Sequence, residues 1–149
     1  MTFMTHTPAD KPLPTHPITT YRGPVQAQWI DYNGHMSEAY YVLAFGYASD
    51  ELYEQIGCGS AYRQQHQCSI YTTESHINYL LGVGEGVELV VTTQVLESSG
   101  KTLRFCHTMT RLDNGEILAF TELFTVFVDT ESERAKTFPA EIQANIDAQ

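Results

Sequence analysis

A short segment combines a carboxylate, a turn and the start of a helix. Asp31 follows a strand-like run at residues 25 to 30, and Asn33-Gly34 is a dipeptide typical of turns. From Met36 onward the apolar residues take the spacing of a helix. We therefore expect Asp31 to face a helix N-terminus, whose unpaired N–H groups and dipole stabilise a developing oxyanion. A carboxylate beside such amides suits acyl transfer.

This segment resembles the hotdog-fold acyl-CoA thioesterases of the 4-hydroxybenzoyl-CoA thioesterase type. Members of that family carry an Asp-x-x-Gly or Asp-x-Asn-Gly-His turn ahead of a central helix that has an early tyrosine. The matching residues here are Asp31, Asn33, Gly34, His35 and Tyr41. The resemblance covers about residues 20 to 130. Within it, the run from Asp31 to Tyr41 is most similar to the betainyl-CoA thioesterases of carnitine breakdown.

The resemblance implies a role for each polar residue of the motif. Asp31 either attacks the thioester carbonyl or acts as a general base on water. The main-chain amides of Ser37 and Glu38, at the helix start, are the implied oxyanion donors. Asn33 and His35 orient Asp31 or the water, or they only shape the turn.

Four aromatic residues crowd the motif, and they suggest a cationic acyl group. Aromatic faces attract quaternary ammonium groups with about 0.5–2 kcal/mol per contact. A trimethylammonium acyl group such as betainyl would therefore suit a cage built here. The alternative is that the four side chains pack in the core. They are Trp29, Tyr32, Tyr40 and Tyr41.

Further candidates for substrate binding lie later in the chain. Glu74 and His76 alternate with Ser75, so they share one face of a strand and either line the second half of the site or face solvent. Coenzyme A carries phosphates and needs local cations, for which Arg63 and Arg104 are candidates or else only surface charges.

Composition restricts the class of protein. A chain of 149 residues with 42% hydrophobic content suits one domain. The net charge of −10 argues against nucleic-acid binding, and no apolar run approaches the ~20 residues that cross a membrane, so we expect a cytoplasmic protein. Three cysteines without ligand spacing indicate reduced packing residues and no metal site. The proposed chemistry requires no cofactor, because coenzyme A belongs to the substrate.

The pattern of elements predicts an α+β fold in which an antiparallel sheet wraps one long helix. The helix is expected at residues 36 to 56, and strands at 67–81, 86–98, 101–113 and 116–129. Residues 1–17 are expected to form a flexible extension, 18–130 the hotdog domain, and 131–149 a tail that could hold a short helix. The resemblance names this fold and implies a homodimer or homotetramer.

The Asn114-Gly115 dipeptide is the best hairpin signal of the chain. If its loop has two residues, His107 faces Glu122 across the ladder, and Thr92 lies opposite His107 through the turn at Ser99-Gly100. Such a cluster is either a satisfied structural pair or a functional one.

Two other functions remain open. Hotdog enoyl-CoA hydratases use an Asp-x-Asn-Pro-x-His type of turn, but this chain lacks the proline and brings the histidine one residue closer. A non-catalytic acyl-binding dimer would keep the fold without turnover. The glycine-rich run Leu81–Gly86 departs from the family pattern, and it is not a phosphate-binding loop because no GxxxxGK[ST] motif accompanies it.

Overall fold

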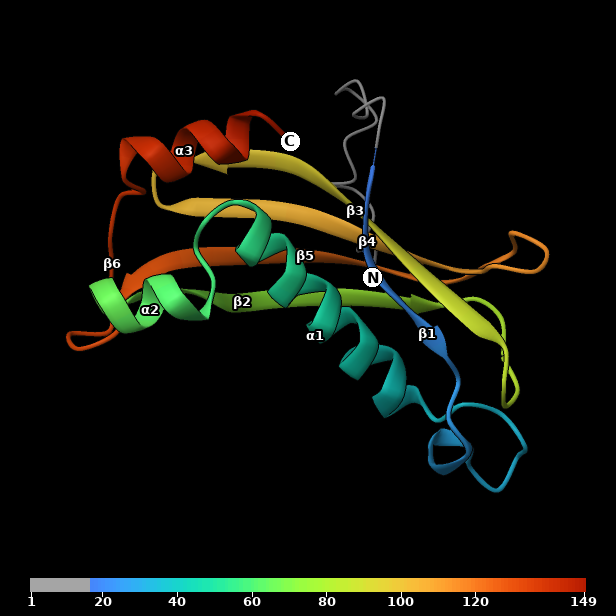
Figure 1. The fold of residues 1–149 in the computed structure, drawn as a ribbon. Coiled ribbons are helices and arrows are strands. Elements are labelled where there is room, and N and C mark those ends of the chain that lie inside the picture. Colours follow the sequence, from blue (N-terminus) through green and yellow to red (C-terminus); the bar gives the residue numbers. More distant parts are fainter. Residues whose placement is uncertain (1–16) are drawn as a thin grey trace.

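A computed structural model describes residues 17–149 and shows an antiparallel sheet with one long helix against it (Figure 1). The strand order is β1-β3-β4-β5-β2, and the short β6 pairs with the end of β5. The strands are β1 (Ile18–Pro24), β2 (Cys68–Tyr79), β3 (Glu88–Ser99), β4 (Thr102–Arg111), β5 (Ile117–Asp129) and β6 (Arg134–Ala135). The structure thus confirms the four strands predicted after the helix.

The long helix is α1 (Glu38–Gln55), close to the predicted range. It buries an apolar stripe whose members recur every three or four residues, as expected for a helix that packs on a sheet. These residues are Tyr41, Ala44, Phe45, Ala48 and Leu52. Gly57 follows α1 with a φ of +81°, a conformation that favours glycine beyond a helix C-terminus.

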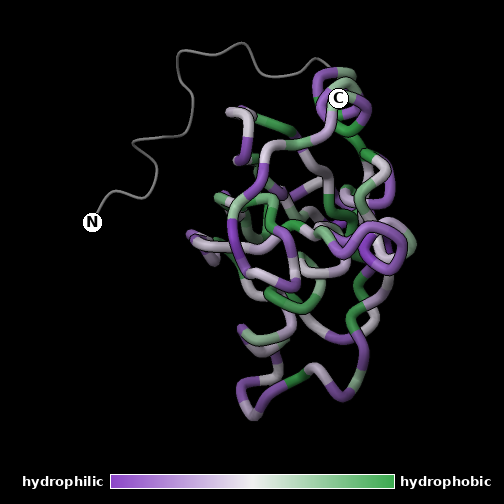
Figure 2. Tube along the Cα trace, turned by 90° about the vertical axis from the view of Figure 1, so that its left-hand side faces the viewer, coloured by the Kyte–Doolittle hydropathy of each residue, from purple (hydrophilic) through white to green (hydrophobic). Residues whose placement is uncertain are grey.

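Two shorter helices complete the fold. One is α2 (Ser60–His66), which the sequence pattern did not predict. The other is α3 (Ala140–Asp147), whose Ile142 and Ile146 are buried in the same apolar cluster as Leu103 and Phe127. Figure 2 shows hydrophobic positions recurring between hydrophilic ones along the chain. None of the helices in residues 17–149 is both long and apolar enough to span a membrane.

The strand predicted at residues 25–30 is wrong. The first strand, β1, lies earlier and pairs with β3, where Thr19 faces Thr92. Residues Ala27–Trp29 instead form a 3-10 turn, closed by the Trp29 N–H to the Gln26 carbonyl at 3.0 Å, which buries the Trp29 ring. Except for Pro17, the predicted extension lies outside the described residues.

The predicted register of the β4–β5 hairpin is also wrong. The connection is longer than two residues, and a register shift follows between Met109 and Thr110. His107 therefore pairs with Thr121 and Thr93, while Glu122 pairs with Cys106. A slip of one residue moves a side chain to the other face of a sheet. His107 accordingly faces α1, and Glu122 lies on the opposite face.

Candidate active site

The predicted turn precedes α1 and is closed by main-chain hydrogen bonds. The Asp31 N–H donates to the His35 carbonyl at 2.9 Å, and the Gly34 N–H donates to the Asp31 carbonyl at 3.0 Å. Gly34 has a φ of +80°, which explains the glycine at this position. Ile30 and Met36 form a β-bridge across the base of the turn. These contacts fix Asp31 at the entrance to α1.

The Asp31 side chain is held by its own turn. Its Oδ1 accepts a hydrogen bond from the main-chain N–H of Asn33 at 2.8 Å. Asp31 is half-buried, whereas Asn33 and His35 are exposed. The main chain of Asn33 therefore orients one carboxylate oxygen, and Oδ2 is left to meet a water or a substrate carbonyl.

The start of α1 offers fewer oxyanion donors than the sequence suggested. The Ser37 N–H donates to the Trp29 carbonyl at 2.9 Å, so in this conformation it is already engaged. The first helical residue is Glu38, and Ser37 makes no side-chain cap. Because the first amides of a helix have no acceptor within it, the Glu38 N–H is the predicted donor that remains available.

A cavity of about 370 Å³ lies beside this helix start. Its wall includes Leu80 and Leu81, which are 55% and 46% exposed. The Tyr41 hydroxyl donates to the Leu81 carbonyl at 3.0 Å and ties α1 to this segment. Burial and the neighbouring Tyr79 raise the pKa of Tyr41, so the hydroxyl stays protonated. The lining residues are Met36, Glu38, Tyr41, Tyr79, Leu80, Leu81 and Gly82.

The four aromatic residues of the motif do not converge on one cage within the chain. Trp29 stacks on Tyr40, with ring centroids 5.5 Å apart and planes 12° apart. Tyr41 is buried and meets the Tyr79 ring edge-on at 5.2 Å. Tyr32 is 98% exposed and so lies apart from the buried rings. The packing alternative therefore describes Trp29 and Tyr41 in this structure.

Glu74 and His76 lie away from this cavity. In β2, Ser75 and Ile77 face α1, because they line a cavity between α1 and the sheet and pair with Leu123 and Thr121. Residues between them in sequence point to the opposite face. Glu74 and His76 are therefore on the sheet face that α1 does not cover, so the structure does not place them in the second half of the site.

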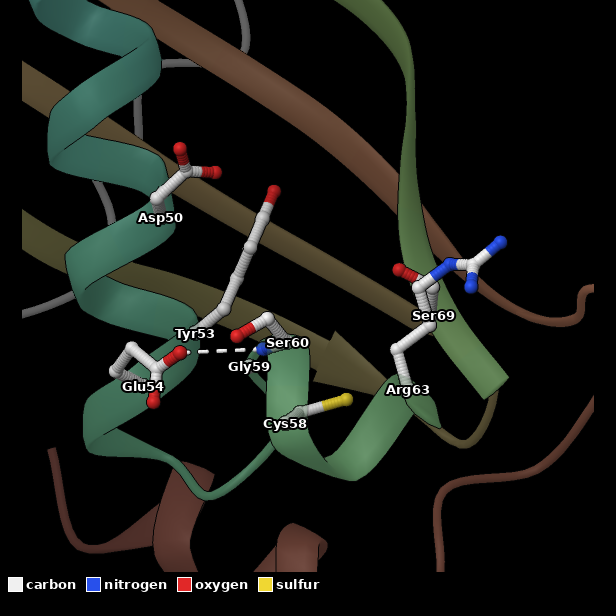
Figure 3. A pocket seen from close by; sticks show the side chains of 8 residues that line it. All are labelled: Asp50, Tyr53, Glu54, Cys58, Gly59, Ser60, Arg63 and Ser69. Carbon is white, nitrogen blue, oxygen red and sulfur yellow. Dashed lines mark hydrogen bonds between the residues drawn. The ribbon is translucent and has the colours of Figure 1, made fainter. Parts of the chain in front are cut away.

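Neither predicted arginine lies beside Asp31. Arg63 is on α2 and lines a cavity with Asp50 and Tyr53 at the C-terminal end of α1 (Figure 3). Asp31 precedes the other end of this 18-residue helix, which is about 27 Å long. Arg104 is on β4, paired with Glu122 and stacked over the Phe124 ring at 5.3 Å. The structure therefore places neither of the two predicted arginines where it could contact CoA phosphates beside Asp31.

Comparison with known proteins identifies the family. The family model of the Thioesterase-like superfamily matches residues 25–146. The chain belongs to this superfamily. It is 37% identical to the betainyl-CoA thioesterase of Pseudomonas aeruginosa over 131 residues, and this alignment covers 88% of this chain and 82% of the relative. It is 36% identical to the L-carnitine dehydrogenase/betainyl-CoA thioesterase of Agrobacterium fabrum, covering 89% of this chain and 27% of that longer protein.

Two solved structures share the fold. A putative thioesterase from Pseudomonas putida KT2440 superposes with a TM-score of 0.78 at 34% identity, over 91% of this chain and 86% of the other. The protein SAV2348 from Staphylococcus aureus, solved in complex with CoA, has a TM-score of 0.82 at 23% identity, over 91% and 85% of the two chains. The hotdog fold and the thioester hydrolase class predicted from the sequence are confirmed.

The thioesterase also contains a buried polar network that the sequence pattern misplaced. His107 Nε2 lies 2.8 Å from Ser49 Oγ, and His107 Nδ1 lies 2.7 Å from Thr93 Oγ1. Thr93 contacts Thr20 at 2.7 Å, and the Thr20 hydroxyl donates to the Val91 carbonyl. Each hydroxyl has one hydrogen to donate. Since Thr20 donates to Val91, Thr93 must donate to Thr20, and His107 Nδ1–H must donate to Thr93. The unprotonated Nε2 then accepts a hydrogen bond from the Ser49 hydroxyl.

This Ser49–His107 pair has the spacing of a nucleophile and its base. However, burial lowers the pKa of His107 to about 3, which makes it a weak base. Its second partner is a threonine in place of a carboxylate. Ser49 is only 7% exposed. The network therefore satisfies buried polar groups in the core, and Asp31 remains the better candidate for chemistry. The contact between His107 and Thr93 could have been predicted from the sequence if the observed register of β3 and β4 had been used.

Proposed function

We propose that this thioesterase hydrolyses a CoA thioester and that its substrate is betainyl-CoA. The observation that carries the chemistry is the Asp31 carboxylate, fixed by the Asn33 amide at 2.8 Å at the entrance to α1. The choice of acyl group rests on the relative from P. aeruginosa, which is 37% identical over most of both chains. A short acyl group also suits a cavity of about 370 Å³ beside the helix start.

The reaction needs an ionised carboxylate and an oxyanion donor. As a general base, Asp31 takes a proton from water while the water oxygen bonds to the thioester carbon. As a nucleophile, Asp31 bonds to that carbon and forms an anhydride, which water then opens. In both routes the Glu38 amide stabilises the oxyanion, the C–S bond breaks, and the thiolate of CoA leaves and takes up a proton. No metal or cofactor takes part.

We also infer a homodimer, with a tetramer as the larger alternative. Strand β2 is an edge of the sheet and is 12 residues long, which leaves a row of unpaired main-chain groups. Beside it, α1 exposes Val42 at 49%, and Val42 lines a cavity with Ser75 and Ile77 of β2. A second copy that pairs with β2 would cover Val42 and bring its own cations toward the CoA phosphates. We also infer that the protein is cytoplasmic, because its three cysteines are free thiols.

Thiol release from a panel of CoA esters tests the proposal. Betainyl-CoA is compared with acetyl-, butyryl-, benzoyl- and palmitoyl-CoA, and crotonyl-CoA is followed for loss of its double bond. We expect kcat/KM for betainyl-CoA to exceed every other value by at least about tenfold. Preference for another ester would keep the class and reject betainyl-CoA.

Two outcomes would replace hydrolysis altogether. Hydration of crotonyl-CoA without thiol release would favour the hydratase. Binding of acyl-CoA without either reaction would favour the acyl-binding dimer.

A further inference from the structure

The glycine-rich run Leu81–Gly86 packs against the Asp31 turn. The Met36 N–H donates to the Val83 carbonyl at 2.8 Å. The Tyr41 hydroxyl donates to the Leu81 carbonyl at 3.0 Å. Gly82 lies between these two anchored residues and also lines the cavity beside α1. Two hydrogen bonds therefore hold Gly82 in place relative to the turn and the helix.

The His35 ring packs against Gly82, where a side chain would collide with it. A Cβ atom built on Gly82 would lie 3.1 Å from His35 Nδ1, 3.2 Å from Cγ and 3.4 Å from Cε1. Contacts this short require the neighbour to move by a few tenths of an ångström. Because Cγ is the ring atom bonded to Cβ, the ring can yield only by rotation about χ1 or by movement of the main chain.

The backbone of Gly82 does not itself require glycine. Its φ lies outside the positive range in which a side chain is strained, in contrast to the +81° of Gly86. The same is true of Gly84, where an added Cβ would meet nothing within 4 Å. Alanine is therefore compatible with the main chain at both positions, and only at 82 does it collide with His35.

A displaced His35 would affect Asp31 through the turn. The His35 carbonyl accepts the Asp31 N–H at 2.9 Å, and the next residue, Met36, carries the bond to Val83. We infer that Gly82 is a positioning residue of this thioesterase, whose missing side chain seats His35 and so fixes Asp31 relative to the Glu38 amide. The inference deepens the proposed function and rests on it for its kinetic test.

The kinetic test compares Gly82→Ala with its matched control, Gly84→Ala. We expect Gly82→Ala to lower kcat about tenfold with KM nearly unchanged, since a misplacement of about 1 Å can cost 10²-fold and the overlap here is smaller. Gly84→Ala should keep the wild-type kcat. The same glycine substitutions are then made in a His35→Ala background, where the collision partner is absent and Gly82→Ala should cost no further activity.

Two results would overturn the inference. One is a Gly82→Ala protein as active as Gly84→Ala. The other is an equal loss from Gly82→Ala with and without the His35 ring, which would mean that Gly82 acts through something else. Thermal unfolding of each variant excludes loss of fold as the cause.

A second readout does not depend on activity. The His35 imidazole resonances, assigned by their disappearance in His35→Ala, should shift in Gly82→Ala and stay in place in Gly84→Ala. If the wild-type protein released no thiol from any CoA ester, the proposed function would fail, and these spectra would still decide whether Gly82 seats His35. Unshifted resonances in Gly82→Ala would contradict the inference.

Discussion

Arg104 Nη1 lies 3.4 Å from Glu122 Oε1 on the face of the sheet that α1 leaves uncovered. The Glu122 side chain is 7% exposed and that of Arg104 is 26% exposed. The same guanidinium lies over the Phe124 ring. Arg104 is thus occupied by a carboxylate and an aromatic face, which argues that it stabilises the sheet and does not bind CoA.

Replacing Arg104 should therefore affect stability and leave substrate binding unchanged. In Arg104→Met, the buried Glu122 carboxylate loses its guanidinium partner. We expect the free energy of unfolding to fall by about 3 kcal/mol, the low end of the range for a broken buried pair, because Arg104 is partly exposed. The double variant with Glu122→Met should recover most of this loss, because it buries no charge. Urea titration measures the stability, and steady-state kinetics measures KM. A tenfold rise in KM would show instead that Arg104 contacts CoA.

Because His107 is buried, we predict that the free energy of unfolding falls as the pH is lowered. Burial lowers its pKa to about 3 from 6.5. Between these values the unfolded state binds more protons than the native state, so stability is full above about pH 6.5 and declines as the pH falls toward 3. Thermal unfolding from pH 7 to pH 4 should show a flatter decline for His107→Gln than for wild type. The exposed His66→Gln is the control, and an equal slope in all three proteins would refute this origin.

Ser49→Ala separates the Asp31 mechanism from a Ser–His mechanism. Without the hydroxyl, His107 Nε2 loses its donor, and we expect stability to fall by about 1–3 kcal/mol. The rate of thiol release should stay within about threefold of wild type, because Ser49 takes no part in the proposed chemistry. A loss of 10³-fold or more in kcat, with the fold intact by circular dichroism, would identify Ser49 as the nucleophile.

The sequence predicted the elements better than their alignment. Helix α1 was predictable because its apolar residues repeat at helical spacing from Tyr41 to Leu52. The Asp31 turn was predictable because Asn33-Gly34 supplies the residue types that its positive φ requires. Both signals lie within a short stretch of sequence, so they can be recognised without knowing which distant residues these segments contact.

The failures concern distant contacts. A register shift beside Thr110 moved His107 and Glu122 to opposite faces, and nothing in the hairpin sequence marks it. The Ser37 amide was expected to be free, yet it bonds to Trp29, because the 3-10 turn before Asp31 brings that carbonyl close. Gly82 lies 47 positions after His35 in the sequence, so only the fold reveals that the two touch.

Asp31→Asn is the most direct test of the proposed chemistry. The substitution keeps the size of the side chain and an acceptor for the Asn33 amide. It removes the charge that, in the proposed mechanism, attacks the thioester or activates water. We predict that kcat for betainyl-CoA falls at least about 100-fold, with KM and thermal stability close to wild type. The matched control, Asp147→Asn on the exposed end of α3, should keep full activity. An Asp31→Asn protein that releases thiol at the wild-type rate would contradict the account.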